Sequence, residues 1–234
     1  MKKLIILTLL VGAGYSGVVA AAEISGNVAL ATDYRFRGIS QTQRDPAIQG
    51  GFDLGVDSGF YVGTWASNVS FTDGGTEIDV YAGWGTDVSE NVAIDIGVLY
   101  YGYPSDPDAD YVEIYGSVGF FGATLGLHYS PEYTYDTDDY FYLYGEYSLP
   151  LGDMLTLDAH VALNQFKNSE ALGSFLGATD PGKNYIDYSL SATIPIAGVD
   201  FTLAWVGTDI DREDCFGGTK DCKGNVVATI SKSL

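Results

Sequence analysis

The chain has 234 residues, with 31 acidic and 11 basic side chains and a formal net charge of −20 at pH 7. Two of the basic residues are Lys2 and Lys3, so the rest of the chain carries only nine. A chain this acidic repels the phosphate backbone of nucleic acids, which argues against nucleic acid as a partner.

The N-terminal segment predicts export. Two lysines precede a strongly apolar run over 4–11, and small residues follow as far as Ala22. These are the basic region, apolar region and cleavage site of a secretory signal peptide. The apolar run is too short for a transmembrane helix. We therefore expect residues 1–22 to be a cleaved signal peptide and 23–234 to form one domain.

The first mature segment, 24–37, alternates apolar and polar residues, as a strand with one apolar face does. On this pattern Tyr34 and Phe36 face lipid at the outer rim. Arg35 and Arg37 then face the interior at the same height.

The same alternation recurs in eleven further segments, most of them eight to twelve residues long, the length that a tilted strand needs to cross a bilayer core. These segments are 48–57, 60–68, 77–84, 92–98, 111–120, 123–130, 140–149, 155–164, 185–194, 199–208 and 225–234. No segment of the mature chain shows a helical period. Twelve alternating segments fit a membrane barrel, and a soluble β-sandwich is the alternative.

The links between the segments favour the barrel, because long and short links alternate strictly. The long links are 37–47, 69–75, 103–110, 131–139, 167–184 and 209–224. The short links are 58–59, 87–91, 121–122, 150–153 and 195–198. Bacterial outer-membrane barrels have long loops outside and short turns in the periplasm, whereas a sandwich has no reason to alternate. The predicted fold class is all-β: a transmembrane antiparallel up-and-down β-barrel of 12 strands.

Aromatic residues on the apolar face sort toward the segment ends, as expected for rings at the two membrane interfaces. The outer set is Tyr34, Tyr100, Tyr129, Phe141, Tyr188 and Trp205. The periplasmic set is Phe60, Trp84, Phe120 and Tyr147.

Several motifs resemble the TorF-type family of proteobacterial outer-membrane porins over essentially the whole mature chain. They are "TDYRFRGISQT", "PAIQGGFDLG", "SGFYVGTWASNV", "EIDVYAGW", "GVLYYGYP", "YVEIYGSVGF" and "ATISKSL". The resemblance implies a β-barrel with a pore function in the Gram-negative outer membrane. The chain departs from the usual barrel pattern by ending in Leu234 rather than an aromatic residue, which predicts weaker recognition by the barrel-insertion machinery.

The inward positions of the barrel predict a pore lined mainly by carboxylates. The predicted pore-lining residues are Asp33, Arg35, Arg37, Asp53, Glu77, Asp79, Asp95, Glu113, His128, Glu146, Asp158, His160 and Asp187. Many other inward positions are glycine, which we expect to leave space for water. The predicted function is passive diffusion of small polar solutes or ions through a narrow, cation-preferring channel.

In an exported chain, Cys215 and Cys222, with six residues between them, predict one disulfide that closes a small loop. A zinc site would need further ligands nearby, and neither histidine is close in sequence. We expect no cofactor and no bound metal, although acidic clusters such as 106–110 and 209–214 could attract divalent cations.

Two alternatives to a channel remain. One is a non-conducting barrel with a structural or surface-interaction role. The other is an outer-membrane hydrolase, but the two histidines point inward and no G-x-S-x-G motif occurs. We therefore expect no enzyme activity. The expected partners are outer-membrane lipids and lipopolysaccharide, the insertion machinery, and the permeating solutes.

Overall fold

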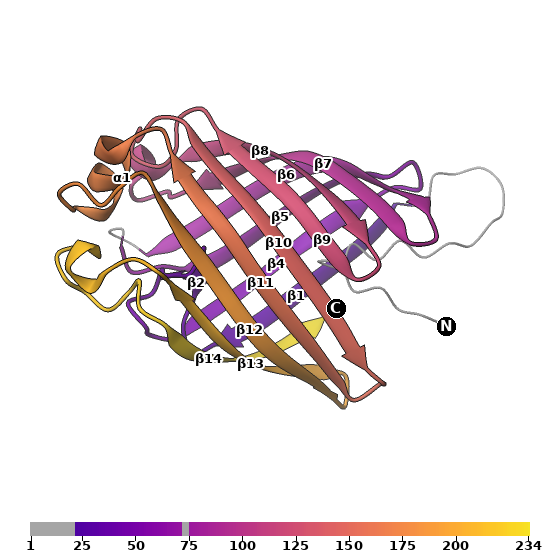
Figure 1. Ribbon diagram of the computed structural model, residues 1–234. Helices are drawn as coiled ribbons and strands as arrows, with labels where there is room; N and C mark the ends of the chain where they lie inside the picture. The colour runs from indigo at the N-terminus through magenta and orange to yellow at the C-terminus, as the bar shows by residue number, and fades with distance from the viewer. Residues whose placement is uncertain (1–21, 72–74) are drawn as a thin grey trace.

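The computed structural model describes residues 22–71 and 75–234, and its long strands close into an antiparallel barrel (Figure 1). The predicted signal peptide lies almost wholly outside the described residues. The barrel strands are β1 (Glu23–Ala31), β4 (Ala47–Gly55), β5 (Phe60–Asn68), β6 (Thr76–Ser89), β7 (Val92–Gly102), β8 (Tyr111–Phe120), β9 (Ala123–Ser130), β10 (Tyr140–Leu151), β11 (Leu155–Phe166), β12 (Asn184–Ile196), β13 (Val199–Thr208) and β14 (Asn225–Ser233). β14 pairs with β1 and closes the ring. The predicted twelve-strand barrel is confirmed.

Apolar side chains cover the outside of the barrel. Each of the twelve strands carries large apolar residues that are exposed, such as Ile24 at 75% and Leu190 at 61%. Their neighbours in sequence point inward, because successive side chains alternate across a strand. A continuous apolar belt of this size marks a surface made for contact with lipid or protein.

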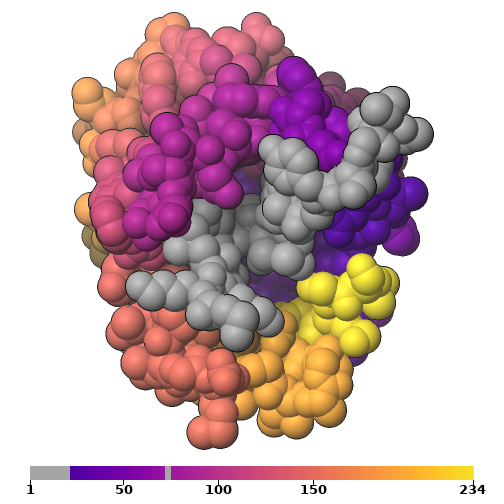
Figure 2. Space-filling model, turned by 90° about the vertical axis from the view of Figure 1, so that its right-hand side faces the viewer, coloured from indigo at the N-terminus to yellow at the C-terminus, as the bar shows by residue number. Residues whose placement is uncertain are grey.

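Short turns and long loops lie at opposite ends of the barrel, as the link lengths predict (Figure 1). Two of the three two-residue turns, 121–122 and 197–198, have positive φ at both residues, which fits the tight hairpin turn that matches strand twist. Figure 2 looks onto this end and shows the turns following one another around a ring in chain order. We call this the inner end and the opposite end the outer end.

The outer loops contain short elements that the sequence pattern did not predict. They are the helix α1 (Ser169–Leu176), the 3₁₀ turns η1 (Pro107–Ala109) and η2 (Arg212–Asp214), and a hairpin of β2 (Arg35–Phe36) and β3 (Ile39–Ser40). α1 begins where the Asn168 side chain accepts a hydrogen bond from the Ala171 N–H at 2.8 Å, and it ends at Gly177 with φ 66°. At eight residues it is too short to show a clear period. Within the described residues, no helix is both long and apolar enough to cross a membrane.

The first outer loop, residues 32–46, folds inward, which corrects the prediction for 24–37. The first strand ends at Ala31, so Tyr34 and Phe36 do not face lipid. Tyr34 is 8% exposed, and its hydroxyl donates to Glu77 at 2.7 Å. The chain turns back at Arg37 and Gly38, both at positive φ. A side chain at Gly38 would overlap Thr208, so the loop fits against the wall only with glycine there.

The buried core of the molecule lies at the outer end. It consists mainly of inward-facing tyrosines from the barrel wall, residues of the first loop, and apolar residues of α1 and the last loop. Its largest fully buried apolar side chains are Tyr140, Phe166, Leu172 and Leu176. Inward positions nearer the inner end are more accessible to solvent. The lumen is therefore packed toward the outer end and wetter toward the inner end.

Candidate pore lining

An ion pair between the first loop and the barrel wall stands at the centre of the packed outer end. Arg37 Nη2 lies 2.8 Å from Glu113 Oε2, and both side chains are almost fully buried. The Arg37 guanidinium carbon lies 4.3 Å from the ring centre of Tyr142 and 4.9 Å from that of Tyr140. Aromatic faces attract cations, so Arg37 occupies a cage of one carboxylate and several rings.

The second predicted arginine is held within the loops rather than by the wall. Arg35 Nε lies 2.7 Å from Asp33, and Arg35 Nη1 donates to the carbonyl of Asp221 at 2.8 Å. Asp221 belongs to the last outer loop, which also contains the disulfide between Cys215 and Cys222. The pairing of Arg35 therefore ties the first loop to the last.

Two further predicted carboxylates, Glu77 and Asp79 on β6, are buried at the same level. Glu77 accepts hydrogen bonds from the hydroxyls of Tyr34 at 2.7 Å and Tyr103 at 2.9 Å. Asp79 is 6% exposed. These acids, like Glu113, lie in the packed layer and are not in contact with open solvent.

The predicted residues nearer the inner end are partly exposed and form a second group. Tyr61 donates to Asp95 at 2.9 Å, and Tyr81 donates to Asp53. Asp158 lies within reach of Ser191, at 3.4 Å. These carboxylates face the accessible part of the lumen, where solvent competes for their oxygens.

The two histidines each contact carboxylates. His160 Nδ1 lies 3.1 Å from Glu146 and its Nε2 lies 2.9 Å from Asp187. His128 Nδ1 lies 2.9 Å from Glu113, so it shares that acid with Arg37. The Glu146 side chain is 49% exposed, whereas Asp187 is buried. His160 thus lies at the boundary between the packed and the accessible parts of the lumen.

Four of the inward glycines do not leave the open space that we expected. Each of them lies directly opposite a tyrosine on the neighbouring strand, and the tyrosine ring lies over it. The register pairs are Gly63 with Tyr81, Gly83 with Tyr61, Gly97 with Tyr115, and Gly126 with Tyr144. A Cβ at any of these glycines would lie within 2.5 Å of the facing ring. The tyrosine rings therefore cover part of the inner wall, and the glycines leave the space that the rings occupy.

Sequence reasoning missed these tyrosines as lining residues because it ranked inward positions by charge. The signal was present in the pattern, since inward tyrosines and inward glycines alternate between neighbouring segments. Gly55 differs from the four covered glycines, because no atom lies within 4 Å of the position that a Cβ would take.

The charge balance of the wall is one-sided. Among the described residues of the barrel strands, the only lysine or arginine is Lys232, which lies on the outward face of β14. Three of the four arginines at the outer end, Arg35, Arg37 and Arg44, come from the first loop, and Arg212 comes from the last. Every charged inward side chain contributed by the strands themselves is therefore a carboxylate or a histidine.

The acidic outer loops contact tyrosine and lysine side chains. Tyr135 donates to Asp106 at 2.8 Å, and burial together with that carboxylate raises the pKa of Tyr135 to about 12. Lys167 lies 2.8 Å from Asp138 and lowers the pKa of that carboxyl. Within 22–71 and 75–234, no group of three or more His, Cys, Asp or Glu side chains is arranged to hold a metal ion.

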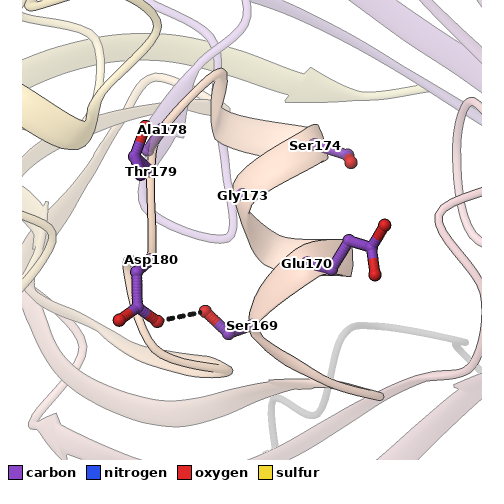
Figure 3. Close-up of a pocket in the computed structure, with 7 residues that line it drawn as sticks. All are labelled: Ser169, Glu170, Gly173, Ser174, Ala178, Thr179 and Asp180. Carbon is purple, nitrogen blue, oxygen red and sulfur yellow. Dashed lines mark hydrogen bonds between the residues drawn. The ribbon is translucent and has the colours of Figure 1, made fainter.

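A shallow depression lies on the outer surface beside α1 (Figure 3). Its lining includes Glu170 and Thr179, and the Ser169 hydroxyl donates to Asp180 at 2.7 Å across it. It is open to solvent, and none of its lining residues is among the predicted pore-lining residues. We do not assign it a function.

The fold resembles solved porin structures. The KdgM porin aligns with a TM-score of 0.58 at 7% sequence identity, over 90% of this chain and 99% of that one. A KdgM porin in complex with disordered oligogalacturonate aligns at 0.57 and 8%, over 90% and 98%. The NanC porin aligns at 0.55 and 9%, over 89% and 98%. At these identities the likeness concerns the fold alone.

No curated protein sequence matches the chain. A family of bacterial proteins matches residues 16–234, under the description "Bacterial protein of unknown function (Gcw_chp)". That description specifies no activity, so the TorF-type assignment stays a prediction. The chain belongs to the Gcw_chp family, and its barrel has the porin fold.

Proposed function

We propose that this protein is an outer-membrane channel for passive diffusion of small ions and small polar solutes, with a preference for cations. The outside of the barrel supports a membrane location, since its exposed apolar side chains form a continuous belt around all twelve strands. Outer-membrane lipids and lipopolysaccharide are then its surroundings, and the barrel-insertion machinery is its assembly partner.

The main support for this proposal is the charge of the inner wall. The accessible part of the lumen presents the carboxylates of Asp53, Asp95, Glu146 and Asp158, and no strand contributes a lysine or arginine to it. Carboxylates at a narrow passage raise the local concentration of cations and exclude anions. Asp53, Asp95 and Asp158 are half-buried and Glu146 is exposed, which supports a hydrated lumen at this level.

The first loop sets the width at the outer end. Its buried contacts with Glu77 and Glu113 hold the loop inside the barrel, where it occupies part of the lumen. In this proposal the channel is narrowest at the level of this loop. It also favours a second candidate, a barrel that does not conduct because its outer end stays closed.

We propose that the protein is not an enzyme. A hydrolase needs a base that activates a nucleophile. In the part of the chain that the structure describes, the hydrogen-bond partners of His128 and His160 are carboxylates and the Tyr142 hydroxyl, with no serine among them. These contacts support a structural and electrostatic role for both imidazoles.

Planar-bilayer recording tests the proposal. The mature protein, refolded in detergent and added to a lipid bilayer in KCl, should produce stepwise current increases of uniform size. A heat-denatured sample provides the control. Folded protein that inserts, as shown by protease protection in vesicles, but gives no steps would overturn the channel and leave the non-conducting barrel.

A further inference from the structure

The cage around Arg37 shows what kind of ligand this wall can hold. The guanidinium lies against the faces of Phe36, Tyr140 and Tyr142, at 4.3 to 4.9 Å from the ring centres. Its charge is balanced by Glu113 at 2.8 Å. Stacked rings with one carboxylate are the recognition chemistry of organic cations.

Aromatic rings beside carboxylates continue along the wall toward the inner end. The Tyr142 ring lies 5.6 Å from that of Tyr144, which in turn lies 6.2 Å from the ring of His160. On the other side, Tyr115 stacks on His128 at 5.3 Å. We call Tyr115, His128, Tyr142, Tyr144 and His160, which lie on the adjacent strands β8 to β11, the aromatic strip.

The inner part of the strip has ring faces turned to the lumen. Tyr115 lies over Gly97 and Tyr144 lies over Gly126, so one face of each ring is against the wall. Both residues are partly exposed, so their rings are in part accessible from the lumen. No arginine of the described chain occupies these faces, in contrast to Tyr142.

The carboxylates beside the strip outnumber the cations. Asp95, Glu113, Glu146 and Asp187 lie along it. Arg37 and the two imidazoles are the cationic groups that face these acids, so a negative balance remains even with both imidazoles charged. A cation that reaches Tyr144 therefore meets Glu146, whose partner is the His160 imidazole at 3.1 Å rather than a lysine or arginine.

We propose that the inner part of the aromatic strip, with Tyr115, Tyr144 and Glu146 as its contacts, binds organic cations that carry a guanidinium or alkylammonium group. A guanidinium would stack on a tyrosine face while Glu146 accepts its N–H donors. Potassium gains less from this surface, because it is more strongly hydrated than a guanidinium and has no planar face. The proposal deepens the proposed function, since it names the solutes that the channel would favour.

Equilibrium binding tests this site without relying on conduction. Arginine amide is titrated into the detergent-refolded protein by calorimetry, with citrulline amide as the control of nearly the same shape. The two ligands share the α-ammonium group and differ in the side chain, which is a charged guanidinium in one and an uncharged urea group in the other. We expect arginine amide to bind at least about tenfold more tightly than citrulline amide, because only the guanidinium combines charge with a stacking face. Equal binding of the two ligands, or no binding of either, would overturn the proposal.

Matched variants locate the site. Tyr144→Leu and Glu146→Gln should each weaken arginine amide binding by about threefold to tenfold. Tyr147→Leu, on the outward face of the same strand, and Glu90→Gln, in an inner-end turn, should leave binding unchanged. Equal losses in all four variants would contradict the assignment.

Bilayer recording separates this proposal from the proposed function. If the protein conducts K⁺ in preference to Cl⁻ but does not bind arginine amide, the proposed binding site is refuted and the proposed channel stands. If the protein binds arginine amide but never conducts, the proposed channel is refuted and the proposed binding site stands.

Discussion

At the residue scale, the pairing of tyrosine with glycine across neighbouring strands shapes the lumen. A tyrosine opposite a larger residue would have to point toward the axis and obstruct it. Opposite glycine, the ring lies along the wall and keeps its hydroxyl near a carboxylate, as Tyr61 does with Asp95. The wall is thus aromatic and acidic at once, with its width set by backbone rather than by side chains.

Gly126→Ala tests this arrangement. The new methyl would lie 2.2 Å from Tyr144 Cζ, so the ring must leave the wall. We expect a loss of about 1–3 kcal/mol in the free energy of unfolding, as for other overpacked sites. The measurement is urea unfolding of the refolded barrel in detergent. Gly55→Ala is the control, because its methyl would meet open space, and an equal loss there would refute the argument.

Lys167 lowers the pKa of Asp138 across two outer loops, and this gives a pH prediction. A carboxyl with a depressed pKa in the folded state contributes stability above its unfolded pKa, and that contribution is lost as the pH falls through the folded value. Both side chains are about half exposed, so screening by water keeps the effect on unfolding small. Carboxyl NMR titration of Lys167→Met should return the Asp138 pKa toward its usual range. An unchanged Asp138 titration would exclude the pair in solution.

At the element scale, the first loop is the part of the fold that most affects the lumen. It leaves the wall at Ala31, crosses the outer end and returns at β4, while Arg35 and Arg37 connect it to the last loop and to β8. The ion pair of Arg37 with Glu113 is buried on both sides. Loss of one partner of this pair therefore leaves a buried charge without its counterpart.

Arg37→Ala should destabilise the loop and widen the passage. Removal of one partner of a buried ion pair costs about 3–5 kcal/mol, and His128 beside Glu113 places the expected loss at the lower end. We also expect a larger single-channel conductance, because the loop loses its anchor at the wall. The measurements are urea unfolding and bilayer recording.

The double variant Arg37→Ala/Glu113→Gln provides the control for this prediction. It should recover much of the lost stability, since no buried carboxylate is left unpaired, while the conductance stays raised. Unchanged conductance in both variants would show that the first loop does not limit the passage.

At the scale of the whole molecule, the alternation of loops and turns assigns an orientation. Single cysteines at 105–110 or 170–180 should react with a membrane-impermeant thiol reagent on intact cells. A cysteine in place of Ser58, in an inner-end turn, should react only after the outer membrane is broken. Labelling in the reverse pattern would overturn the assigned orientation.

The barrel could be predicted from the sequence because its two determinants are local. Side-chain alternation indicates how many strands there are and which side chains point outward. Link length indicates which end of the barrel has the long loops. The inward fold of the first loop could not be predicted in the same way, because Tyr34 and Phe36 continue the alternation past the end of the strand. Their direction depends on distant partners, Glu77 for Tyr34 and Tyr101 for Phe36, which only the closed barrel brings near.

The candidate lining was predicted in part for the same reason. The inward carboxylates follow from alternation alone. Their division into a buried outer group and an accessible inner group depends on which loops cover them. The tyrosine rings lie flat only because the cross-strand register places glycine opposite each of them.

The zero-current potential across a KCl gradient tests the central claim of a cation-preferring channel most directly. The mature protein is inserted into a planar bilayer with concentrated KCl on one side and dilute KCl on the other. Because the accessible wall carries carboxylates and no strand lysine or arginine, K⁺ should cross more readily than Cl⁻. The dilute side should then become positive relative to the concentrated side. A dilute side that becomes negative would mean anion selectivity and would contradict the account.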